Sequence, residues 1–307
     1  MNQFSHLNGK YTKISTSAYN KKMLVISMFF AFSITGCSTL PKHKTEYLAQ
    51  PTTTIDTSQT SLAQMIEPLQ KQHEGLTGYH VLFEPLEALA TRLRLIDRAE
   101  KTLDLQYYIW DNDKVGALAL HALIRAADRG VKVRLLIDDN NAKRTEGIFL
   151  ALAQHPNIEV KLFNPYRFRK HRSLDMVLDL KRINRRMHNK SFIADHQIAL
   201  IGGRNMTNQY YNVSDNYQFS DVDVMLFGTA VHEISDSFDD YWNHEYAYDV
   251  REIISQKSHR LSYESLKQQL DEHYRRASVQ NFLDLTRRTQ AIDEFLQLIG
   301  RVDRKGQ

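Results

Sequence analysis

The segment HNKSFIADHQIALIGGRN, residues 188–205, decides how the centre of this chain folds. Two short apolar runs flank Asp195 and His196, a pattern that predicts a β-hairpin turning at these two residues. Residues i and i+2 of an extended chain share a face, so His188 and Lys190 can point at one substrate group. The hairpin therefore predicts a reactive cluster at the start of its first strand.

The residue types in this segment suit phosphate chemistry. An imidazole can attack phosphorus, an ammonium neutralises phosphoryl oxygens, and a carboxamide donates a directed hydrogen bond. Paired glycines let the backbone approach an anion with no side chain between them. The returning strand supplies Gly202, Gly203 and Asn205 beside the histidine and the lysine. Chemistry on a phosphodiester is therefore the leading interpretation.

Residue for residue, the segment resembles the HKD signature of the phospholipase D superfamily, H-x-K-x4-D-x6-G-G-x-N. The matching positions are His188, Lys190, Asp195, Gly202, Gly203 and Asn205. The commoner signature has serine at the position of Gly203, although a Gly-Gly form also occurs. The resemblance implies a phospholipase D-like α-β-α sandwich with a central mixed sheet, and a covalent phosphohistidine on His188.

A second acidic segment follows at residues 219–227, which predict a core strand that opens with Asp221 and Asp223 on one face. A nucleophilic histidine needs a carboxylate that fixes its tautomer and stabilises its charged form. In the enzymes that this chain resembles, an acid in a similar Ser-Asp-Val-Asp context faces the histidine. Asp221 is therefore the candidate partner and Asp223 the alternative, whereas Asp195 is expected to brace the hairpin turn.

The remaining pattern predicts an α/β fold. The chain has 307 residues, of which 42% are hydrophobic, and it can bury a substantial core. The alternating apolar periodicities indicate β-α-β units, which favour a largely parallel or mixed sheet between helical layers. Helices are expected over 85–99 and 114–129, and strands over 103–109, 131–137 and 158–163.

A basic cluster precedes the signature. It holds nine basic residues against two acidic ones: Arg167, Arg169, Lys170, Arg172, Lys181, Arg182, Arg185, Arg186 and Lys190, with Asp175 and Asp179. One interpretation is attraction of anionic lipid headgroups or of a nucleic-acid backbone, and the other is a solvated helical face. Arg186, two residues before the histidine, is a candidate substrate-binding residue.

The amino terminus indicates export and anchoring. Lys21 and Lys22 precede a twelve-residue apolar run, 23–34, which is too short to span a bilayer comfortably and suits a signal peptide. Small residues before Cys37, the one cysteine in the chain, resemble a bacterial lipobox, in which this thiol is acylated. Ser38 resembles the pattern of lipoproteins sent to the outer membrane, on its periplasmic face. The alternative is a buried structural cysteine after an uncleaved helix.

Four segments are expected along the chain: a lipoprotein signal peptide over 1–37, a tether over 38–76, the HKD-containing domain over 77–250, and a helical segment over 251–307. Enzymes of this superfamily use a second HKD histidine to protonate the leaving alcohol, and the nearest imitation here is His273-Tyr274-Arg275. The chain is therefore interpreted either as the first half of a two-motif enzyme or as a homodimer that pairs two copies of His188. We favour the first interpretation, since the single-motif nucleases of this superfamily are much shorter.

The lipobox, the segment 106–110, the basic insert and Gly-Gly-Arg-Asn together resemble the bacterial cardiolipin synthase C group. This resemblance implies transfer of a phosphatidyl group between phospholipids at a membrane surface, with no metal and no other cofactor. The rival interpretations are an envelope-attached phospholipase D, a nuclease, or an inactive lipid-binding remnant. Anionic phospholipid is the expected partner, and nucleic acid is not expected.

Overall fold

The computed structural model describes residue 40 and residues 54–214 and 217–288. Within these residues the strands form one eight-stranded sheet, in the order β1-β7-β6-β5-β2-β3-β4-β8. The strands are β1 Thr77–Leu82, β2 Thr102–Tyr107, β3 Lys132–Asp138, β4 Ile158–Phe163, β5 Ser191–Ala194, β6 Ile198–Gly202, β7 Asp223–Gly228 and β8 Ala247–Asp249. Strands β2, β3 and β4 are parallel, and the pairs on either side of them are antiparallel. The expected mixed sheet is confirmed.

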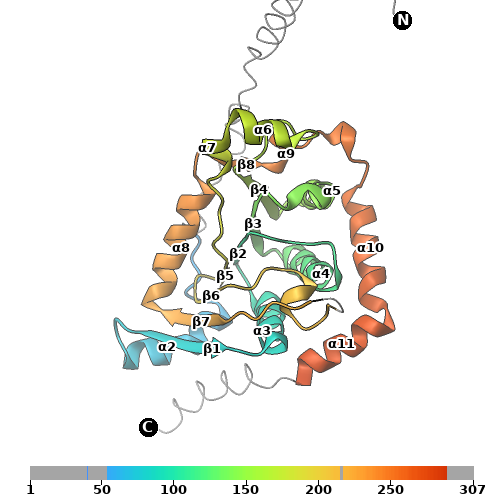
Figure 1. Cartoon of the computed structure of the whole chain (residues 1–307). Coiled ribbons are helices and arrows are strands. Elements are labelled where there is room, and N and C mark those ends of the chain that lie inside the picture. Colours follow the sequence, from blue (N-terminus) through green and yellow to red (C-terminus); the bar gives the residue numbers. More distant parts are fainter. Residues whose placement is uncertain (1–39, 41–53, 215–216, 289–307) are drawn as a thin grey trace, which may run out of the picture. The chain divides into compact units, whose positions relative to one another are not determined.

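Helices cover both faces of this sheet, so the expected α-β-α sandwich is confirmed. Helix α8 lies on one face, and α3, α4, α5, α10 and α11 lie on the other (Figure 1). The helices are α2 Ser61–Gln72, α3 Pro85–Arg98, α4 Lys114–Asp128, α5 Glu146–Leu152, α6 Arg172–Leu178, α7 Leu180–Ile183, α8 Thr229–Trp242, α9 Val250–Ile253, α10 Tyr263–Arg275 and α11 Ala277–Arg288. Short 3-10 turns lie at 142–144, 208–210 and 256–258.

The local chemistry of the sequence explains where these elements begin and end. Helix α3 begins with Pro85 in its first turn, where a missing backbone N–H costs nothing. The Asp113 carboxylate accepts a hydrogen bond of 3.0 Å from the N–H of Gly116 at the start of α4. This helix gives way to Gly130, whose φ of +98° suits a helix C-cap. The helices expected over 85–99 and 114–129 are confirmed.

The hairpin joins the parallel strands through an antiparallel pair. Strand β5 pairs with β2, so that Ala194 lies opposite Leu103. The turn carries Asp195 and His196 with φ of +49° and +52°, a left-handed conformation that Asp and His adopt more readily than most residues. The expected hairpin is confirmed. The expected strand over 219–227 is corrected, because β7 begins only at Asp223.

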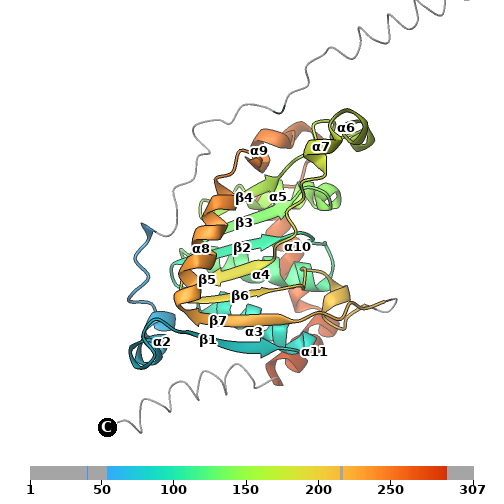
Figure 2. The same cartoon turned by 60° about the vertical axis from the view of Figure 1, so that its left-hand side comes forward.

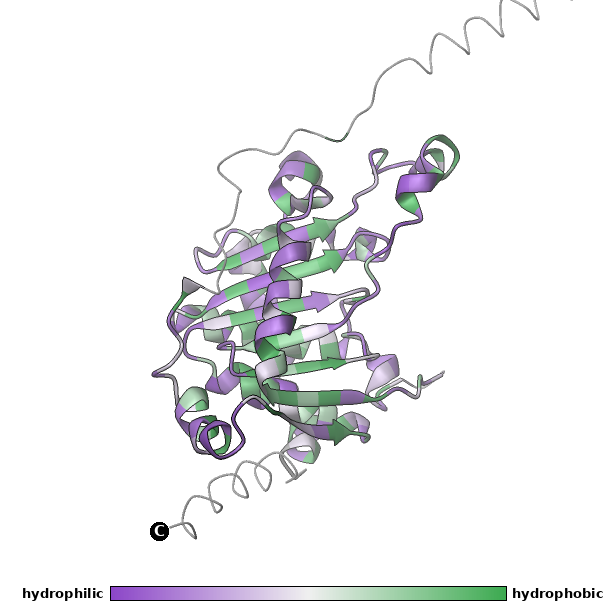
Figure 3. Cartoon of the chain, turned by 90° about the vertical axis from the view of Figure 1, so that its left-hand side faces the viewer, coloured by the Kyte–Doolittle hydropathy of each residue, from purple (hydrophilic) through white to green (hydrophobic). Residues whose placement is uncertain are grey.

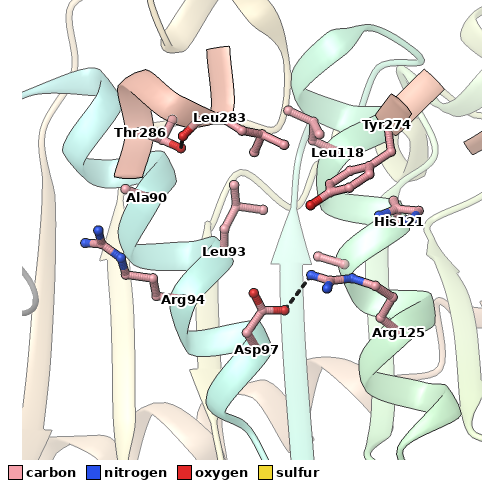
Figure 4. Close-up of a pocket in the computed structure, with 11 residues that line it drawn as sticks. Ala90, Leu93, Arg94, Asp97, Leu118, His121, Arg125, Tyr274, Leu283 and Thr286 are labelled. Carbon is pink, nitrogen blue, oxygen red and sulfur yellow. Dashed lines mark hydrogen bonds and ion pairs between the residues drawn. The ribbon is translucent and has the colours of Figure 1, made fainter. Parts of the chain in front are cut away.

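The segment after β8 returns to the sandwich as two packed helices. Leu266 and Leu270 of α10 and Phe282 and Leu283 of α11 are buried in the same core as α3 and α4. A pocket lies where these four helices meet, and Figure 4 shows the Tyr274 and His121 side chains along it. The two rings stack with centroids 4.3 Å apart. The expected signal peptide, Cys37 and residues 289–307 of the expected helical segment lie outside the described residues.

Candidate active site

The signature lies at the edge of the sheet where the parallel strands end. His188 lies three residues before β5, Tyr108 immediately follows β2, and Asp138 is the last residue of β3. Because neighbouring parallel strands end at one edge of a sheet, their following residues gather there. The β5–β6 hairpin runs antiparallel to β2, so its entry and not its turn meets this edge.

His188 and Lys190 lie together, as their i, i+2 spacing predicts. The Lys190 Nζ lies 3.0 Å from Nδ1 and 3.3 Å from Nε2 of the imidazole, and it donates a hydrogen bond of 2.6 Å to the His188 carbonyl. The lysine side chain is buried, whereas the histidine side chain is exposed to solvent. The Tyr108 ring also packs against the imidazole, with ring centroids 4.8 Å apart. The candidate nucleophile therefore contacts a lysine and a tyrosine while its side chain stays exposed to solvent.

The surroundings disfavour the charged form of the imidazole. Desolvation lowers the pKa of His188 from its ordinary value, the charge of Lys190 lowers it further, and Asp221 opposes both. Burial also lowers the pKa of Lys190, against the opposing charge of Asp221. No carboxylate among the described residues lies within 4.0 Å of the Lys190 ammonium. A neutral ring beside an unpaired cation suits attack on an anionic phosphodiester.

The two glycines make room for carboxylates of the neighbouring segment. A Cβ on Gly203 would lie 1.8 Å from Oδ1 of Asp221, and a Cβ on Gly202 would lie 2.1 Å from Oδ1 of Asp223. The side of each glycine where a substituent would project is therefore filled. The glycines thus let two aspartates approach the strand. The interpretation that they also open the backbone to a substrate phosphate stays a prediction.

The two downstream aspartates have different surroundings. Asp223 is fully buried, and its Oδ2 lies 2.9 Å from Nη1 of Arg92 and 3.4 Å from Nη1 of Arg204. Asp221 is half-buried and precedes the strand, and its charge acts on His188 and Lys190. Asp221 therefore remains the candidate partner of the histidine. Asp223, the alternative, is committed to the buried arginines.

Asn205 has a structural task at the same edge. Its side chain is buried, its Oδ1 accepts a hydrogen bond of 2.9 Å from the Ile109 N–H, and its Nδ2 donates one of 3.0 Å to the Tyr210 hydroxyl. The amide thus ties the segment after β6 to the segment after β2. Its expected hydrogen bond to a phosphoryl oxygen stays a prediction.

Asp195 lies at the other end of the hairpin. Its carboxylate accepts hydrogen bonds from three successive backbone N–H groups, those of Glu100, Lys101 and Thr102, at 3.0, 2.8 and 2.8 Å. The residue is fully buried, and it fixes the hairpin turn to the start of β2. The structure places it as a brace and not among the groups that can touch substrate at His188.

The basic cluster is largely neutralised within the protein. Arg186 pairs with Asp138 at 3.0 Å, and Arg172 pairs with Glu146 at 3.0 Å. Five of the nine basic residues make such pairs: Arg167 with Asp179, Arg169 with Asp139 and Glu146, Arg172 with Asp139 and Glu146, Arg182 with Asp175 and Asp179, and Arg186 with Asp138. The cluster therefore does not form one uniformly free basic face, since five of its arginines have internal partners, whereas Lys170, Lys181 and Arg185 make no such pair with another described residue.

Asp138 is a site residue that the sequence analysis missed. Its Oδ2 accepts a hydrogen bond of 2.8 Å from the Met187 N–H, which holds the backbone next to His188. Desolvation raises its pKa to about 6, although Arg186 opposes that rise. Arg186, expected to bind substrate, also donates to the Asn164 carbonyl at 2.7 Å. The sequence feature that could have indicated Asp138 is an Asp-Asp pair at the end of a buried strand, followed by an arginine-rich insert.

The described residues hold no group of three or more His, Cys, Asp or Glu side chains that could bind a metal ion. A search of the same residues for a helix both long and apolar enough to cross a bilayer finds none. The expected absence of a metal or other cofactor stays a prediction.

Comparison with known proteins places this geometry in a family. The family described as "Cardiolipin synthase, PLD-like domain" matches residues 93–242. Cardiolipin synthase C of Escherichia coli is 49% identical over 181 residues, which cover 59% of this chain and 38% of that protein. An uncharacterized protein of Helicobacter pylori strain J99 is 35% identical over 222 residues, 72% of this chain and 43% of its own length. The chain thus spans about two fifths of the length of these relatives.

Among solved structures, a phospholipase D family member, Nuc from Salmonella typhimurium, aligns with a TM-score of 0.42 at 18% identity, over 57% of this chain and 98% of that one. The matched region 93–242 contains the whole hairpin and both downstream aspartates. Residues 93–242 of the chain therefore carry a PLD-like domain, and the chain is similar in sequence to Cardiolipin synthase C.

Proposed function

We propose that this chain is the first half of a phosphatidyltransferase that makes cardiolipin from phospholipids through a phosphohistidine on His188. The observation that carries the proposal is the exposed imidazole whose Nδ1 lies 3.0 Å from the buried ammonium of Lys190. Its similarity to Cardiolipin synthase C supports the substrate class. The lipid that donates the phosphatidyl group stays open, and phosphatidylglycerol is a natural acceptor.

The reaction has two displacement steps at phosphorus. In the first, a ring nitrogen of His188 attacks the phosphodiester, the bond from phosphorus to the headgroup oxygen breaks, and the departing alkoxide takes up a proton. In the second, an acceptor hydroxyl loses its proton and attacks the same phosphorus, and the phosphorus–nitrogen bond breaks. If the acceptor is the hydroxyl of phosphatidylglycerol the product is cardiolipin, and if it is water the product is phosphatidic acid.

Neighbouring charges lower the barrier to both steps. The Lys190 ammonium neutralises negative charge on the phosphoryl oxygens as the phosphorus becomes five-coordinate. The Asp221 carboxylate stabilises the positive charge that the imidazole acquires while it holds the phosphoryl group. Asp138 and Asn205 act as positioning residues, since one holds the backbone at Met187 and the other holds the segment after β6.

The proton for the departing alkoxide requires a second acid. His273, the nearest imitation of a second signature histidine, lies in α10, and its pKa is lowered mainly by burial. We therefore assign the acid to a second half of a longer protein or to a second copy of this chain. A dimer active on its own would favour the second copy, and activity that appears only with a downstream half would favour the first.

Attachment to the cell envelope forms part of the proposal. The apolar run over 23–34 followed by Cys37 supports a lipoprotein anchor in the outer membrane, facing the periplasm. Mass spectrometry of the mature protein tests this point directly. An acylated Cys37 at the new amino terminus is the expected result, and an unmodified, uncleaved chain contradicts it.

The activity is tested with labelled phosphatidylglycerol in mixed micelles, with His188→Ala as the matched control. Cardiolipin as the product supports the synthase, phosphatidic acid identifies a hydrolase, and cleavage of added DNA identifies a nuclease. Acid-labile label trapped on the protein, and absent from His188→Ala, supports the phosphohistidine. A chain that neither turns over lipid nor traps label, alone or with a downstream half, would be a non-catalytic remnant.

A further inference from the structure

Helices α6 and α7 present a cluster of large apolar side chains to solvent. Val177 is 82% exposed, and its neighbours Leu174, Met176, Leu178 and Leu180 are between 44% and 57% exposed. Isolated exposed apolar residues are ordinary, but a contiguous set marks a surface that binds something. We call these five residues the α6–α7 patch.

The base of these two helices is tied firmly to the domain. The buried Asp175 carboxylate accepts a hydrogen bond of 2.9 Å from the Phe168 N–H, and Arg182 donates to Asp179 and Asn164 at 2.7 and 2.6 Å. Arg172 donates to the Asp139 carbonyl at 2.8 Å. Arg172, Asp175 and Arg182 thus bind to the body of the domain, and this arrangement leaves the apolar side chains exposed.

Three cations accompany the patch. Lys170, Lys181 and Arg185 are exposed, and none of them makes an ion pair with another described residue. The five arginines of the same segment that make ion pairs lie beneath them. Exposed apolar side chains combined with free lysine or arginine side chains are the composition of a surface that rests in the headgroup layer of an anionic bilayer.

The patch lies next to the candidate active site. Helix α7 ends at Ile183, five residues before His188, and Asp138 holds the intervening segment at Met187. Figure 2 shows α6 and α7 beyond the arrowheads of β3 and β4, the strand ends at which the site lies. Figure 3 shows apolar residues on the same two helices at this edge of the molecule.

We propose that the α6–α7 patch docks the domain on an anionic phospholipid bilayer, with its apolar side chains in the interface and its three cations against lipid phosphates. This inference deepens the proposed function, on which it rests for the identity of the substrate. The bilayer would then supply substrate at the edge of the sheet that carries His188. The free cations favour this occupant over an apolar protein surface, because anionic headgroups pair with them.

The first test places a fluorescent probe in the patch of the full chain. The two native tryptophans, Trp110 and Trp242, are 1% and 0% exposed, so they are shielded from quenchers in lipid. Val177→Trp puts an indole in the patch, and Leu285→Trp puts one at an exposed position of α11 as the matched control. Each variant is mixed with vesicles of phosphatidylglycerol and phosphatidylcholine that carry brominated acyl chains.

Docking predicts a blue shift and roughly twofold quenching of the fluorescence added at position 177, and neither change at position 285. Neutralising the cations with Lys170→Gln, Lys181→Gln and Arg185→Gln is expected to raise the lipid concentration required by about 100-fold. The control neutralises three exposed lysines elsewhere, Lys101, Lys143 and Lys257. It should leave the quenching of the patch probe unchanged.

Three results would overturn the docking proposal. The first is an unquenched patch probe in a chain that nevertheless sediments with vesicles, and the second is equal quenching at both positions. The third is a blue shift without lipid that grows with protein concentration, which would identify a protein partner. Quenching at position 177 in a chain that makes no phospholipid product supports docking and contradicts the proposed function. A chain that makes phospholipid product while the probe at position 177 stays unquenched supports the proposed function and contradicts docking.

Discussion

The two ends of the β5–β6 hairpin carry parts of one signature and have opposite physical characters. At the turn, Asp195 is fully buried, and three backbone N–H groups donate to its carboxylate. At the entry, His188 is exposed, and the ammonium beside it has no carboxylate within ion-pairing distance among the described residues. The Asp195 carboxylate already accepts several hydrogen bonds, so the turn end of the hairpin can hold structure but cannot bind a ligand. The entry has a nucleophile, His188, and a cation, Lys190, available.

This difference teaches that a sequence signature mixes two kinds of requirement. The spacing from His188 to Asp195 equals the length of β5 plus its approach, so the aspartate fixes where the strand ends and the histidine stands where it begins. Gly202 and Gly203 belong with the scaffold, because each gives space to an aspartate. Asp195 and the two glycines therefore have structural surroundings, whereas His188 lies at the end of the hairpin that is open to solvent.

The largest effect on turnover is expected when the His188 imidazole is removed. His188→Ala should lower turnover by about 10⁴-fold or more, because no other group replaces the nucleophile. Its free energy of unfolding should change by less than about 0.5 kcal/mol, since the side chain is exposed. Initial rates and urea unfolding curves measure the two quantities. A variant that unfolds readily, or retains a tenth of its activity, would break the comparison.

The next effect concerns the turn of the hairpin, where Asp195 lies. Asp195→Ala leaves three backbone N–H groups without their acceptor, that of Thr102 being buried, so the free energy of unfolding should fall by about 3–5 kcal/mol. Asp195→Asn, which keeps one oxygen acceptor, should lose less. Urea unfolding measures both. If Asp195→Ala kept its stability and lost only turnover, the aspartate would belong to the reactive end after all.

The paired glycines allow the same comparison between scaffold and site at two adjacent residues. A Cβ on Gly202 would lie 2.6 Å from the Val222 carbonyl and 2.7 Å from Asp223 Cα, backbone atoms that cannot swing aside. Gly202→Ala should therefore cost about 2–4 kcal/mol of unfolding free energy. On Gly203 the new atom meets only the Asp221 side chain, which can rotate, so Gly203→Ala should cost under about 1 kcal/mol.

Turnover distinguishes Gly202→Ala and Gly203→Ala in a different way from stability. Gly203→Ala displaces the Asp221 carboxylate, whose charge acts on His188, so its turnover should fall by more than its stability does. Rates measured well below the unfolding midpoint of each variant separate the two effects. Equal losses of stability in the two variants would show that Asp221 is held as rigidly as Asp223.

The sequence predicted the hairpin, the helices and the mixed sheet because each depends on local periodicity and turn chemistry. The Asp195-His196 turn and the Gly130 cap are examples, since both use residues suited to left-handed backbone. The partner of each charged residue could not be predicted in the same way. The link between Asp138 and Arg186 spans 48 residues of sequence, and only the pairing of β3 with the path after β4 brings them together.

The glycines illustrate the same limit at the site. Their spacing predicted a close approach, but the approaching group comes from a segment about twenty residues away whose register with β6 is a property of the whole sheet. Similarly, the arginine-rich insert resembled one basic surface. Its separation into internal ion pairs and three free cations depends on the carboxylates of β3 and α5.

The smallest expected effect tests how Asp221 acts at the reactive end. Its charge raises the pKa of His188 against the larger lowering by desolvation and Lys190, so Asp221→Asn should move that pKa further down. NMR titration of the His188 ring, assigned with His188→Ala, measures the shift, and Asp236→Asn on the exposed side of α8 is the control. The acidic limb of the rate profile should then extend to lower pH, since the neutral ring is the nucleophile. Turnover at the plateau should nevertheless fall, because the charged phosphohistidine loses its counter-charge. A pKa that stays constant or rises in Asp221→Asn would remove this carboxylate from the site.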